Sequence, residues 1–504
     1  MRSSRAGRTD IDEAVGNKEM YFSSLVFIIG FMPLFFLIYY LIPERWKYGT
    51  AVKNAVLFLG SLIFYAYGEP RYVFLMLASI VINYFLAMQM GGTTGRSYAR
   101  KARRRFCYHV ALLFNIGMLF FFKYSFFVTH NINRLFFYLA VHTRFALPYV
   151  PELELANPIG ISFYTFQILS YVIDTYYKRY EPEKNILYLG TYITMFPQLI
   201  AGPIVTYPEI ERRLHQRHIT AKSVDLGVKT FILGLASKIL IANRIGILWT
   251  DIERIGYESL STPLAWMGAF AYSFQIYFDF YGYSLMAIGL GQMLGFYLPE
   301  NFKDPYLSGS ASEFWRRWHV TLGRWFKNYL YIPLGGSREG KMRTLRNLFL
   351  VWLFTGMWHG ADWNFILWGM LFFVLLVLER AFLGKVLEKA RFLSVPYMLF
   401  VIPVSWVLFA IDDLQKLGIY FSRMFPFVPV DYVSNVSAGD YLRYGEIYAP
   451  CFLMAVIFCI PWVKKKLRGM LRRWPGTVLC IILFLFCIYF LAQGLDNPFL
   501  YYRF

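Results

Sequence analysis

The sequence predicts an all-α protein that crosses a membrane many times. Hydrophobic residues make up 57% of the 504 residues and charged residues only 16%, whereas soluble domains carry about 25% charged residues. A helix needs about 20 apolar residues to cross the hydrocarbon of a bilayer. Because hydrocarbon offers the backbone no water, we expect such runs to be helical. Uncharged runs of about this length cover Phe22–Pro43, Tyr72–Met90, Leu155–Ile173, Asn185–Pro208, Phe392–Ile411 and Trp474–Leu495.

The chain begins with a polar extension, residues 1–19, that we expect to be disordered, and residues 20–504 are predicted to form a single transmembrane domain. Shorter or singly interrupted apolar runs lie at Asn54–Gly68, Tyr108–Phe122, Ser259–Pro299 and Ile447–Val463. Together with the long runs they bring the expected total to about eleven to thirteen spans.

The middle of the chain is expected to depart from simple spans. Asn185–Pro208 contains Pro197, Gly202 and Pro203 and precedes a basic loop, so we expect a re-entrant segment that enters the membrane and returns. Lys303–Arg346 is amphipathic and rich in Trp, Tyr, Arg and Lys, which predicts helices lying at the cytoplasmic interface. Between them, three basic residues interrupt the otherwise apolar helix Asp225–Trp249: Lys229, Lys238 and Arg244.

The formal net charge of +20 reflects topology and contact with membrane lipid, not nucleic-acid binding. Basic residues collect in the cytoplasmic loops of membrane proteins. We therefore assign to the cytoplasm the four densest basic runs: Gly95–Phe106, Arg212–Lys222, Lys303–Arg346 and Lys464–Arg473. Counting spans from these runs places both the N-terminus and the C-terminus outside the cell.

No set of residues has the spacing of a metal site. The seven histidines include no pair at metal-ligand spacing. The cysteines lack metal-ligand and redox spacing, and we assign no function to Cys107, Cys451, Cys459, Cys480 and Cys487.

His359 is the histidine that most needs an explanation, because it lies in the apolar stretch GMWHGADWNF, Gly356–Phe365. A charged side chain at the centre of a spanning helix costs about 2.5–3.5 kcal/mol on insertion scales, so an ionisable residue there suggests a function. The alternative is a neutral histidine that bonds across helices, with Asp362 as helix cap or partner. The nearby Trp358 and glycines indicate a close-packed cavity and not a lipid-facing surface.

His319 lies in SEFWRRWHVTLGRWF, Ser312–Phe326, after a polar opening that reads as a helix start. Taken alone, this segment fits an interfacial helix with arginines that reach the headgroups. Together, His319 at the cytoplasmic edge and His359 within the membrane could bracket a path between the two faces.

Six motifs in order make the chain resemble the membrane-bound O-acyltransferase family. They are YFSSLVFIIGFMPL near Met20, PIGISFYTFQILSYVIDTY (Pro158–Tyr176), FPQLIAGPIV (Phe196–Val205), FDFYGYSLMAIGLGQMLGF (Phe278–Phe296), FWRRWH with YIPLGGSR (Tyr331–Arg338), and GMWHGADWNFILWG (Gly356–Gly369). The most similar branch contains alginate and peptidoglycan O-acetylation membrane proteins and the teichoic acid D-alanyl-transfer membrane protein. Within it, YIPLGG favours the alginate type.

The chain departs from this branch at two positions. Tyr281 stands where the branch usually has a small residue, and Thr206 where it often has arginine. Both departures bear on substrate details and not on the reaction class.

The resemblance implies a multi-pass O-acyltransferase of a bacterial cell membrane. It would move an acyl group, with acetyl as the expected one, from a cytoplasmic thioester towards an extracellular polysaccharide or cell-wall polymer. The donor would be acetyl-CoA or an acyl carrier protein, both of which suit a basic cytoplasmic face, and no cofactor would be bound. The resemblance also implies an extracytoplasmic esterase-like transferase as partner.

The resemblance implies His359 as the catalytic histidine and His319 as a second, supporting one. Imidazole, with a reference pKa of about 6.5, can accept a hydroxyl proton in its neutral form. Asp362 would orient His359, and Asn364 and Trp358 are candidate hydrogen-bond donors to the developing oxyanion.

The C-terminal sequence NPFLYYRF, Asn497–Phe504, admits two interpretations. Aromatic residues after a span usually form an anchoring belt at the membrane interface. The ending also resembles a tyrosine-bearing C-terminal motif of some acyl-transfer systems, which implies that Tyr501, in preference to Tyr502, carries the acyl group as a relay.

Two alternatives to acetyl transfer stay open at the level of sequence. One is D-alanyl transfer from a carrier protein to teichoic acid. The other belongs to a different class of protein, a transporter or flippase in which His359 and Asp362 relay protons.

Overall fold

The computed structural model describes residues 20–91, 98–143, 147–427, 439–494 and 499–500. Within these ranges the regular elements are helices and no strand occurs, which confirms the predicted all-α class. The polar extension at residues 1–19, predicted to be disordered, lies outside the described residues. The prediction that residues 20–504 form one domain stays a prediction.

The described residues group into two compact units. The first unit consists of the described residues up to Asn115 together with Pro158–Ile200 and Thr206–His218. The second consists of Ile116–Asn157, Ala201–Val205 and the described residues from Ile219 onward. Helices of the first unit are η1 (Val26–Phe31), α2 (Met32–Tyr40), α3 (Gly49–Gly68), α4 (Tyr72–Met90), α6 (Ile161–Tyr176), α7 (Ile186–Thr194), α8 (Phe196–Leu199), α9 (Tyr207–His215) and the first part of α5 (Tyr98–Thr143).

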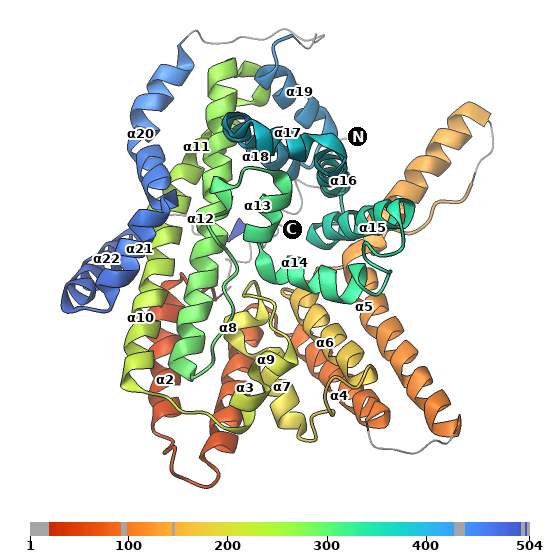
Figure 1. Ribbon diagram of the computed structural model, residues 1–504, viewed down its shortest axis with the longest axis vertical. Helices are drawn as coiled ribbons and strands as arrows, with labels where there is room; N and C mark the ends of the chain where they lie inside the picture. The colour runs from red at the N-terminus through yellow and green to blue at the C-terminus, as the bar shows by residue number, and fades with distance from the viewer. Residues whose placement is uncertain (1–19, 92–97, 144–146, 428–438, 495–498, 501–504) are drawn as a thin grey trace. The chain divides into compact units, whose positions relative to one another are not determined.

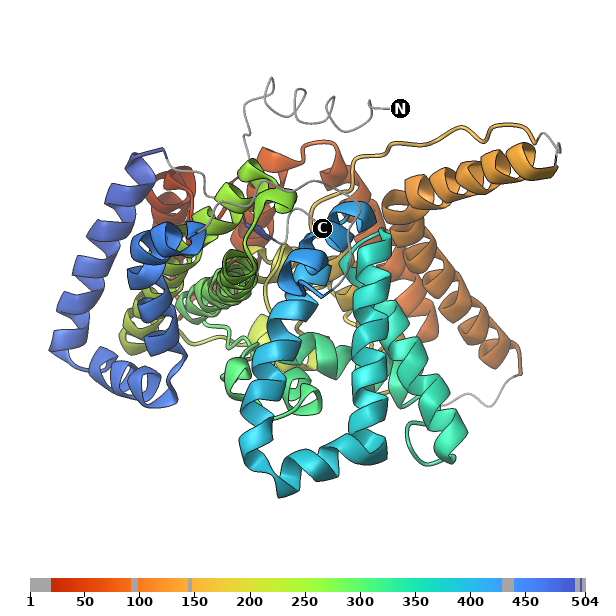
Figure 2. The same cartoon turned by 90° about the horizontal axis from the view of Figure 1, so that it is seen from above.

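The second unit holds the remainder of α5 and most other helices (Figure 1). They are α10 (Ala221–Ala236), η2 (Ser237–Ala242), α11 (Asn243–Ile255), α12 (Thr262–Leu294), α13 (Ala311–Arg317), α14 (Val320–Phe326), α15 (Lys341–His359), α16 (Trp363–Leu378), α17 (Gly384–Lys389), α18 (Ser394–Ala410), α19 (Leu414–Met424), α20 (Asp440–Cys459), α21 (Pro461–Leu471) and α22 (Trp474–Ala492). In Figure 2, α16 and α18 stand side by side and α17 joins their ends.

Eight helices among the described residues are long and apolar enough to cross a membrane. They cover Gly49–Gly68, Tyr72–Met90, Ala99–Thr143, Ala221–Ile255, Trp363–Lys389, Arg391–Ala410, Asp440–Cys459 and Trp474–Ala492, and a shorter apolar helix covers Val26–Tyr40. The multi-pass prediction is confirmed, although this number is below the total of about eleven to thirteen that apolar runs suggest.

Part of the difference arises where an apolar run is broken. In Asn185–Pro208, Asn185 caps α7 by accepting from the Leu187 amide, α7 ends at Thr194, and Met195 is non-helical before the four-residue α8, which contains Pro197. The segment is therefore broken, as expected. Its re-entrant course in the membrane stays a prediction.

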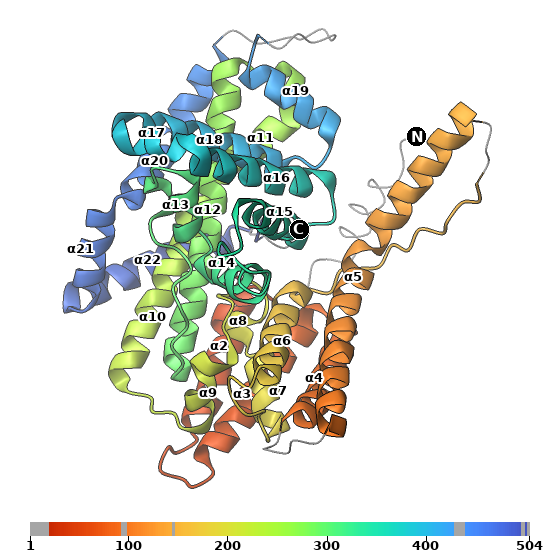
Figure 3. The same ribbon diagram turned by 45° about the vertical axis from the view of Figure 1, so that its right-hand side comes forward.

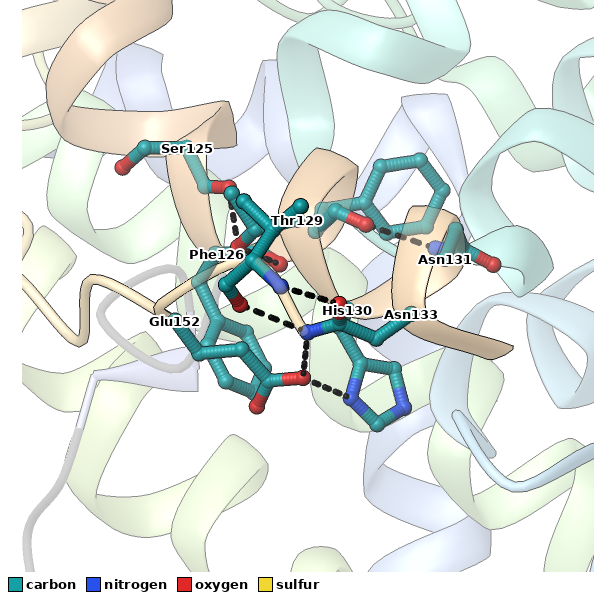
Figure 4. Close-up of polar contacts among 9 residues, drawn as sticks. Ser125, Phe126, Thr129, His130, Asn131, Asn133 and Glu152 are labelled. Carbon is teal, nitrogen blue, oxygen red and sulfur yellow. Dashed lines mark hydrogen bonds and ion pairs between the residues drawn. The ribbon is translucent and has the colours of Figure 1, made fainter. Parts of the chain in front are cut away.

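Helix α5 corrects the sequence prediction in the opposite direction. It runs for 46 residues and includes His130, His142 and part of the basic run Gly95–Phe106, for which the sequence predicts a cytoplasmic loop. The helix contains no proline and a single glycine, so charge alone does not end it. Near its C-terminal end, the ring of His130 and the amide of Asn133 converge on Glu152 of the following segment at 3.2 and 3.1 Å (Figure 4).

Helices α10 and α12 lie side by side in the second unit with their backbones in contact (Figure 1). A Cβ added at Gly227 would lie 2.7 Å from the carbonyl oxygen of Gly289, and one at Gly234 would lie 2.5 Å from that of Gly282. On each helix the two glycines are separated by about two turns, so the helices run antiparallel through two glycine-to-glycine contacts. Small residues permit this close approach.

We expect Gly234→Ala to destabilise the protein by about 1–3 kcal/mol, because the new methyl group overlaps the α12 backbone. Gly117→Ala is a matched control, since a Cβ there meets no atom within 4 Å. Replacing a helix-interior glycine in open space should instead stabilise by about 0.4–1 kcal/mol. Thermal unfolding in detergent measures both, and equal effects of the two substitutions would contradict the contact.

Candidate active site

His359 lies at the end of α15, where α15 packs closely against α16 (Figure 3). A Cβ at Gly356 would lie 2.4 Å from the carbonyl oxygen of Phe365, and one at Gly369 would lie 2.4 Å from that of Trp352. Any side chain at these positions would force the hairpin apart. The close packing predicted for the GMWHGADWNF stretch is thus present.

The His359 imidazole is buried, with an exposed fraction of 4%. Its Nδ1 lies 2.7 Å from the carbonyl oxygen of Thr355, one turn earlier in α15. Because a carbonyl oxygen only accepts hydrogen bonds, Nδ1 carries the proton in the neutral ring and Nε2 carries the lone pair. The rings of Trp368 and Phe409 flank the imidazole at centroid distances of 4.9 and 5.4 Å.

Two side chains of α5 bind the carbonyl end of α15. Lys123 Nζ donates to the carbonyl oxygen of Trp358, and the Tyr124 hydroxyl donates to that of Met357. The last carbonyl groups of a helix lack partners within the helix, and a lysine near that end also suits the helix dipole. These contacts hold the turn that carries His359.

His319 lies between α13 and α14 and is also buried, with an exposed fraction of 1%. Its backbone adopts the left-handed conformation with φ of 42°. Such a conformation is unfavourable for a residue with a side chain and persists only when its surroundings enforce it. Nearby aromatic rings, including Phe314 and Trp318, are buried inside the unit.

Asn301 is the residue that fixes the His319 side chain. Its Oδ1 accepts from the Thr321 amide at 3.2 Å and from the Thr321 hydroxyl at 2.9 Å, and it lies 3.0 Å from His319 Nδ1. Since this oxygen is an acceptor, His319 Nδ1 carries the proton. Nε2 of His319 is buried and has no hydrogen-bond partner among the described residues.

Glu379, at the end of α16, positions the helix that leads to His319. Its carboxylate accepts from the amides of Ala311 and Ser312 at 2.6 and 2.9 Å and from the Tyr397 hydroxyl at 2.9 Å. The carboxylate therefore caps the N-terminus of α13, where amides lack partners and negative charge is favoured. Ser310 is the N-cap and accepts from the Glu313 amide, which confirms the helix start read from sequence.

Trp358 connects the two histidines. Its indole centroid lies 5.9 Å from that of His319 and 5.0 Å from that of His359. The ring of Phe280 from α12 also lies next to His319, at a centroid distance of 4.8 Å. The structure thus brings together both predicted histidines in one aromatic-lined region, each with Nε2 as the basic nitrogen of the neutral ring.

The other predicted site residues have these places. Asp362 is the N-cap of α16 and accepts from the Trp363 amide at 2.8 Å, which is the helix-cap alternative considered from sequence. Asn364 donates through Nδ2 to the carbonyl oxygen of Phe409 at 2.9 Å and so ties α16 to α18. Tyr501 lies outside the described residues. The catalytic roles of all these residues stay predictions.

Sequence reasoning missed several residues that shape this site, among them Lys123 and Asn301. Lys123 was detectable as a charge inside the apolar stretch FFKYSFF, Phe121 to Phe127, where an ionisable residue suggests a function. Asn301 carried no signal, because a polar residue after a helix is ordinary in a loop. Among the described residues, no group of histidine, cysteine and acidic residues could hold a metal ion.

Comparison with known proteins matches residues 183–403 to the membrane-bound O-acyltransferase family. A protein of Pseudomonas putida named probable alginate O-acetylase is 36% identical over 410 residues, which cover 81% of both chains. The peptidoglycan O-acetyltransferase of Helicobacter pylori is 31% identical and covers 96% of this chain and 98% of its own. The teichoic acid D-alanyltransferase of Bacillus subtilis is 27% identical over 57% of this chain.

We expect Asn301→Ala to lower the free energy of unfolding by about 2–5 kcal/mol, because it leaves several buried donors without an acceptor at about 1–3 kcal/mol each. Asn131→Ala is the control, since Asn131 accepts one exposed hydrogen bond, from Trp363 Nε1, and donates one to the Phe127 carbonyl of its own helix. That control should cost no more than about 1 kcal/mol. Thermal unfolding in detergent compares them, and similar losses would refute the role of Asn301 around His319.

Proposed function

The chain belongs to the membrane-bound O-acyltransferase family, and from this premise we propose that it transfers acetyl from a cytoplasmic thioester towards an extracellular polysaccharide or cell-wall polymer. It is a membrane O-acyltransferase. The choice of acetyl is supported by the names of the Pseudomonas putida and Helicobacter pylori relatives. The observation that carries the proposal is the pair of buried imidazoles that both lie next to the Trp358 ring.

In the proposed reaction, His359 is the general base. The acceptor hydroxyl gives its proton to Nε2 as its oxygen attacks the thioester carbonyl carbon. The carbon–sulfur bond then breaks, and the departing thiolate takes the proton from the imidazolium, so that an ester and a free thiol result. The hydrogen bond from Nδ1 to the Thr355 carbonyl orients the ring for this step.

His319, which also lies next to Trp358, supports the reaction. With Nδ1 directed to Asn301, its Nε2 is available to accept a hydrogen bond from a substrate group. Trp358 and Asn364 are candidate donors to the developing oxyanion. One amide hydrogen of Asn364 already serves the Phe409 carbonyl, so only the second could do so.

The donor is proposed to be acetyl-CoA or an acyl carrier protein. Both are anionic, and the basic runs assigned to the cytoplasm would attract them. The protein is proposed to reside in a bacterial cytoplasmic membrane with both termini outside. Acyl groups would thus move from the inner to the outer face.

On the outer face, Tyr501 is proposed to receive the acyl group as a relay before an extracytoplasmic esterase-like transferase completes delivery. A phenol has a pKa of about 10. Its ester is therefore more reactive than that of an aliphatic alcohol, which suits a carrier that passes the group on. The partner is proposed by analogy with the family branch that the motifs resemble.

D-alanyl transfer to teichoic acid is the weaker candidate, since the Bacillus subtilis relative is less similar and covers less of the chain. Family membership makes the protein an enzyme. The acyltransferase function therefore replaces the alternative of a transporter, which the sequence pattern of His359 and Asp362 had left open.

Purified protein in lipid with isotope-labelled acetyl-CoA tests the proposal. We expect covalent label on the wild type, labelling slowed by about 10²–10⁴-fold in His359→Ala through loss of the base, and no label in Tyr501→Phe. Tyr502→Phe is the matched control and should keep the label. Label lost only in His359→Ala would exclude Tyr501 as acceptor, and an unlabelled wild type would exclude acetyl-CoA as donor.

We also expect Lys123→Met to lower kcat by about 10–100-fold with little change in KM, because a shift of about 1 Å at His359 disrupts the reacting geometry. Lys101→Met, on the exposed part of the same helix, is the control. Steady-state acetyl transfer measures both variants after thermal unfolding has established that they are folded. An unchanged kcat in Lys123→Met would exclude a positioning role.

A further inference from the structure

An ion pair is buried between α10–η2 and α12. Lys238 Nζ lies 2.7 Å from Asp279 Oδ1, and the two side chains have exposed fractions of 3% and 1%. Burying both charges is costly and is recovered only when their geometry is favourable. Such a pair therefore calls for an explanation beyond stability.

The ion pair lies about one helical turn from a glycine contact between α10 and α12. Lys238 follows Gly234 by one turn on one helix, and Asp279 precedes Gly282 by about one turn on the antiparallel helix. Lys238 also lies within the π-helical turn η2, Ser237–Ala242. Such turns are frequent at functional sites, where the wider turn alters side-chain direction.

The second oxygen of Asp279 binds the C-terminal segment of the chain. Asp279 Oδ2 accepts a hydrogen bond from the Leu500 amide at 2.8 Å. Phe499 and Leu500 are buried, and the Phe499 ring stacks on Tyr283 at a centroid distance of 4.5 Å. A segment that follows a spanning helix is thus bound by a charged carboxylate inside the second unit.

This binding site borders the histidine site. The ring of Phe280, next to Asp279 in α12, lies 6.3 Å from the Phe499 ring and 4.8 Å from the His319 imidazole. One turn of α12 therefore contacts both the C-terminal segment and His319. In the sequence, Tyr501 directly follows Leu500.

We propose that Asp279, held by Lys238, is a positioning residue that docks the C-terminal segment beside the histidine site by binding the Leu500 amide. Lys238 compensates the charge of the carboxylate, so Asp279 stays an acceptor in an apolar surrounding. Phe499 supplies the apolar contact that fixes the register. The docking stands on these contacts alone, and only its use in acyl transfer rests on the proposed function.

Hydrogen–deuterium exchange of the C-terminal peptide, in protein held in lipid nanodiscs, tests the docking without any substrate. The double variant Lys238→Met with Asp279→Leu removes both charges and the acceptor, and replacing a buried ion pair by apolar residues usually preserves folding. We expect the Leu500 amide to exchange about 10–100-fold faster, as loss of a hydrogen bond to a charged group predicts.

The double variant Lys238→Met with Asp279→Asn is the matched comparison, because it removes the charges but keeps an acceptor oxygen. We expect it to retain most of the protection. Phe499→Ala, which leaves the ion pair intact, should also release the segment. Asp304→Asn, in the separate Lys464–Asp304 pair, should leave exchange unchanged.

Equal exchange in the two double variants, or full protection in Phe499→Ala, would overturn the docking. Faster exchange as expected, together with unchanged polymer acetylation in the same variants, would leave the docking intact and exclude a role for the segment in transfer. Loss of both protection and acetylation would support docking as the step that positions Tyr501.

Discussion

Backbone contact between α15 and α16 is the constraint on which the histidine site depends. At Gly356 and Gly369 each helix occupies the space that a side chain would need on the other. The contact fixes where α15 ends, and with it the position of His359. Only at that end are carbonyl groups left over for Lys123 and Tyr124 to bind.

Burial explains why the remaining polar contacts are so specific. A buried donor or acceptor without a partner costs about 1–3 kcal/mol, so a polar group inside a membrane protein must have its partner in the right place. Asn301 is the hydrogen-bond acceptor for buried donors around His319. Glu379 accepts from the amides at the start of α13, and Asp279 accepts from the Leu500 amide. Each contact that satisfies a buried group also fixes an element of the site.

Helix content was predictable from sequence because the bilayer permits few alternatives to a helix, but helix boundaries were not. Charges in α5 suggested loops, yet nothing in that stretch prevents helix formation, and one helix continues. Asn185–Pro208 has no charges, yet its helix breaks at Met195. His359 was recognisable as an ionisable group in an apolar stretch. Asn301 was not, since its importance comes from donors about 20 residues away in sequence.

By itself the sequence determined the all-α multi-pass class and the family, and it singled out His319 and His359 as candidate site residues. Composition and ordered motifs allow this because they are local properties of the chain. Tertiary structure decided which side chains hold those histidines and where the C-terminal segment binds. Lys123 and Trp358 are 235 positions apart, and Leu500 and Asp279 are 221 apart. Packing alone brings such residues within hydrogen-bond distance, because the helices that carry them must satisfy their buried polar groups against one another.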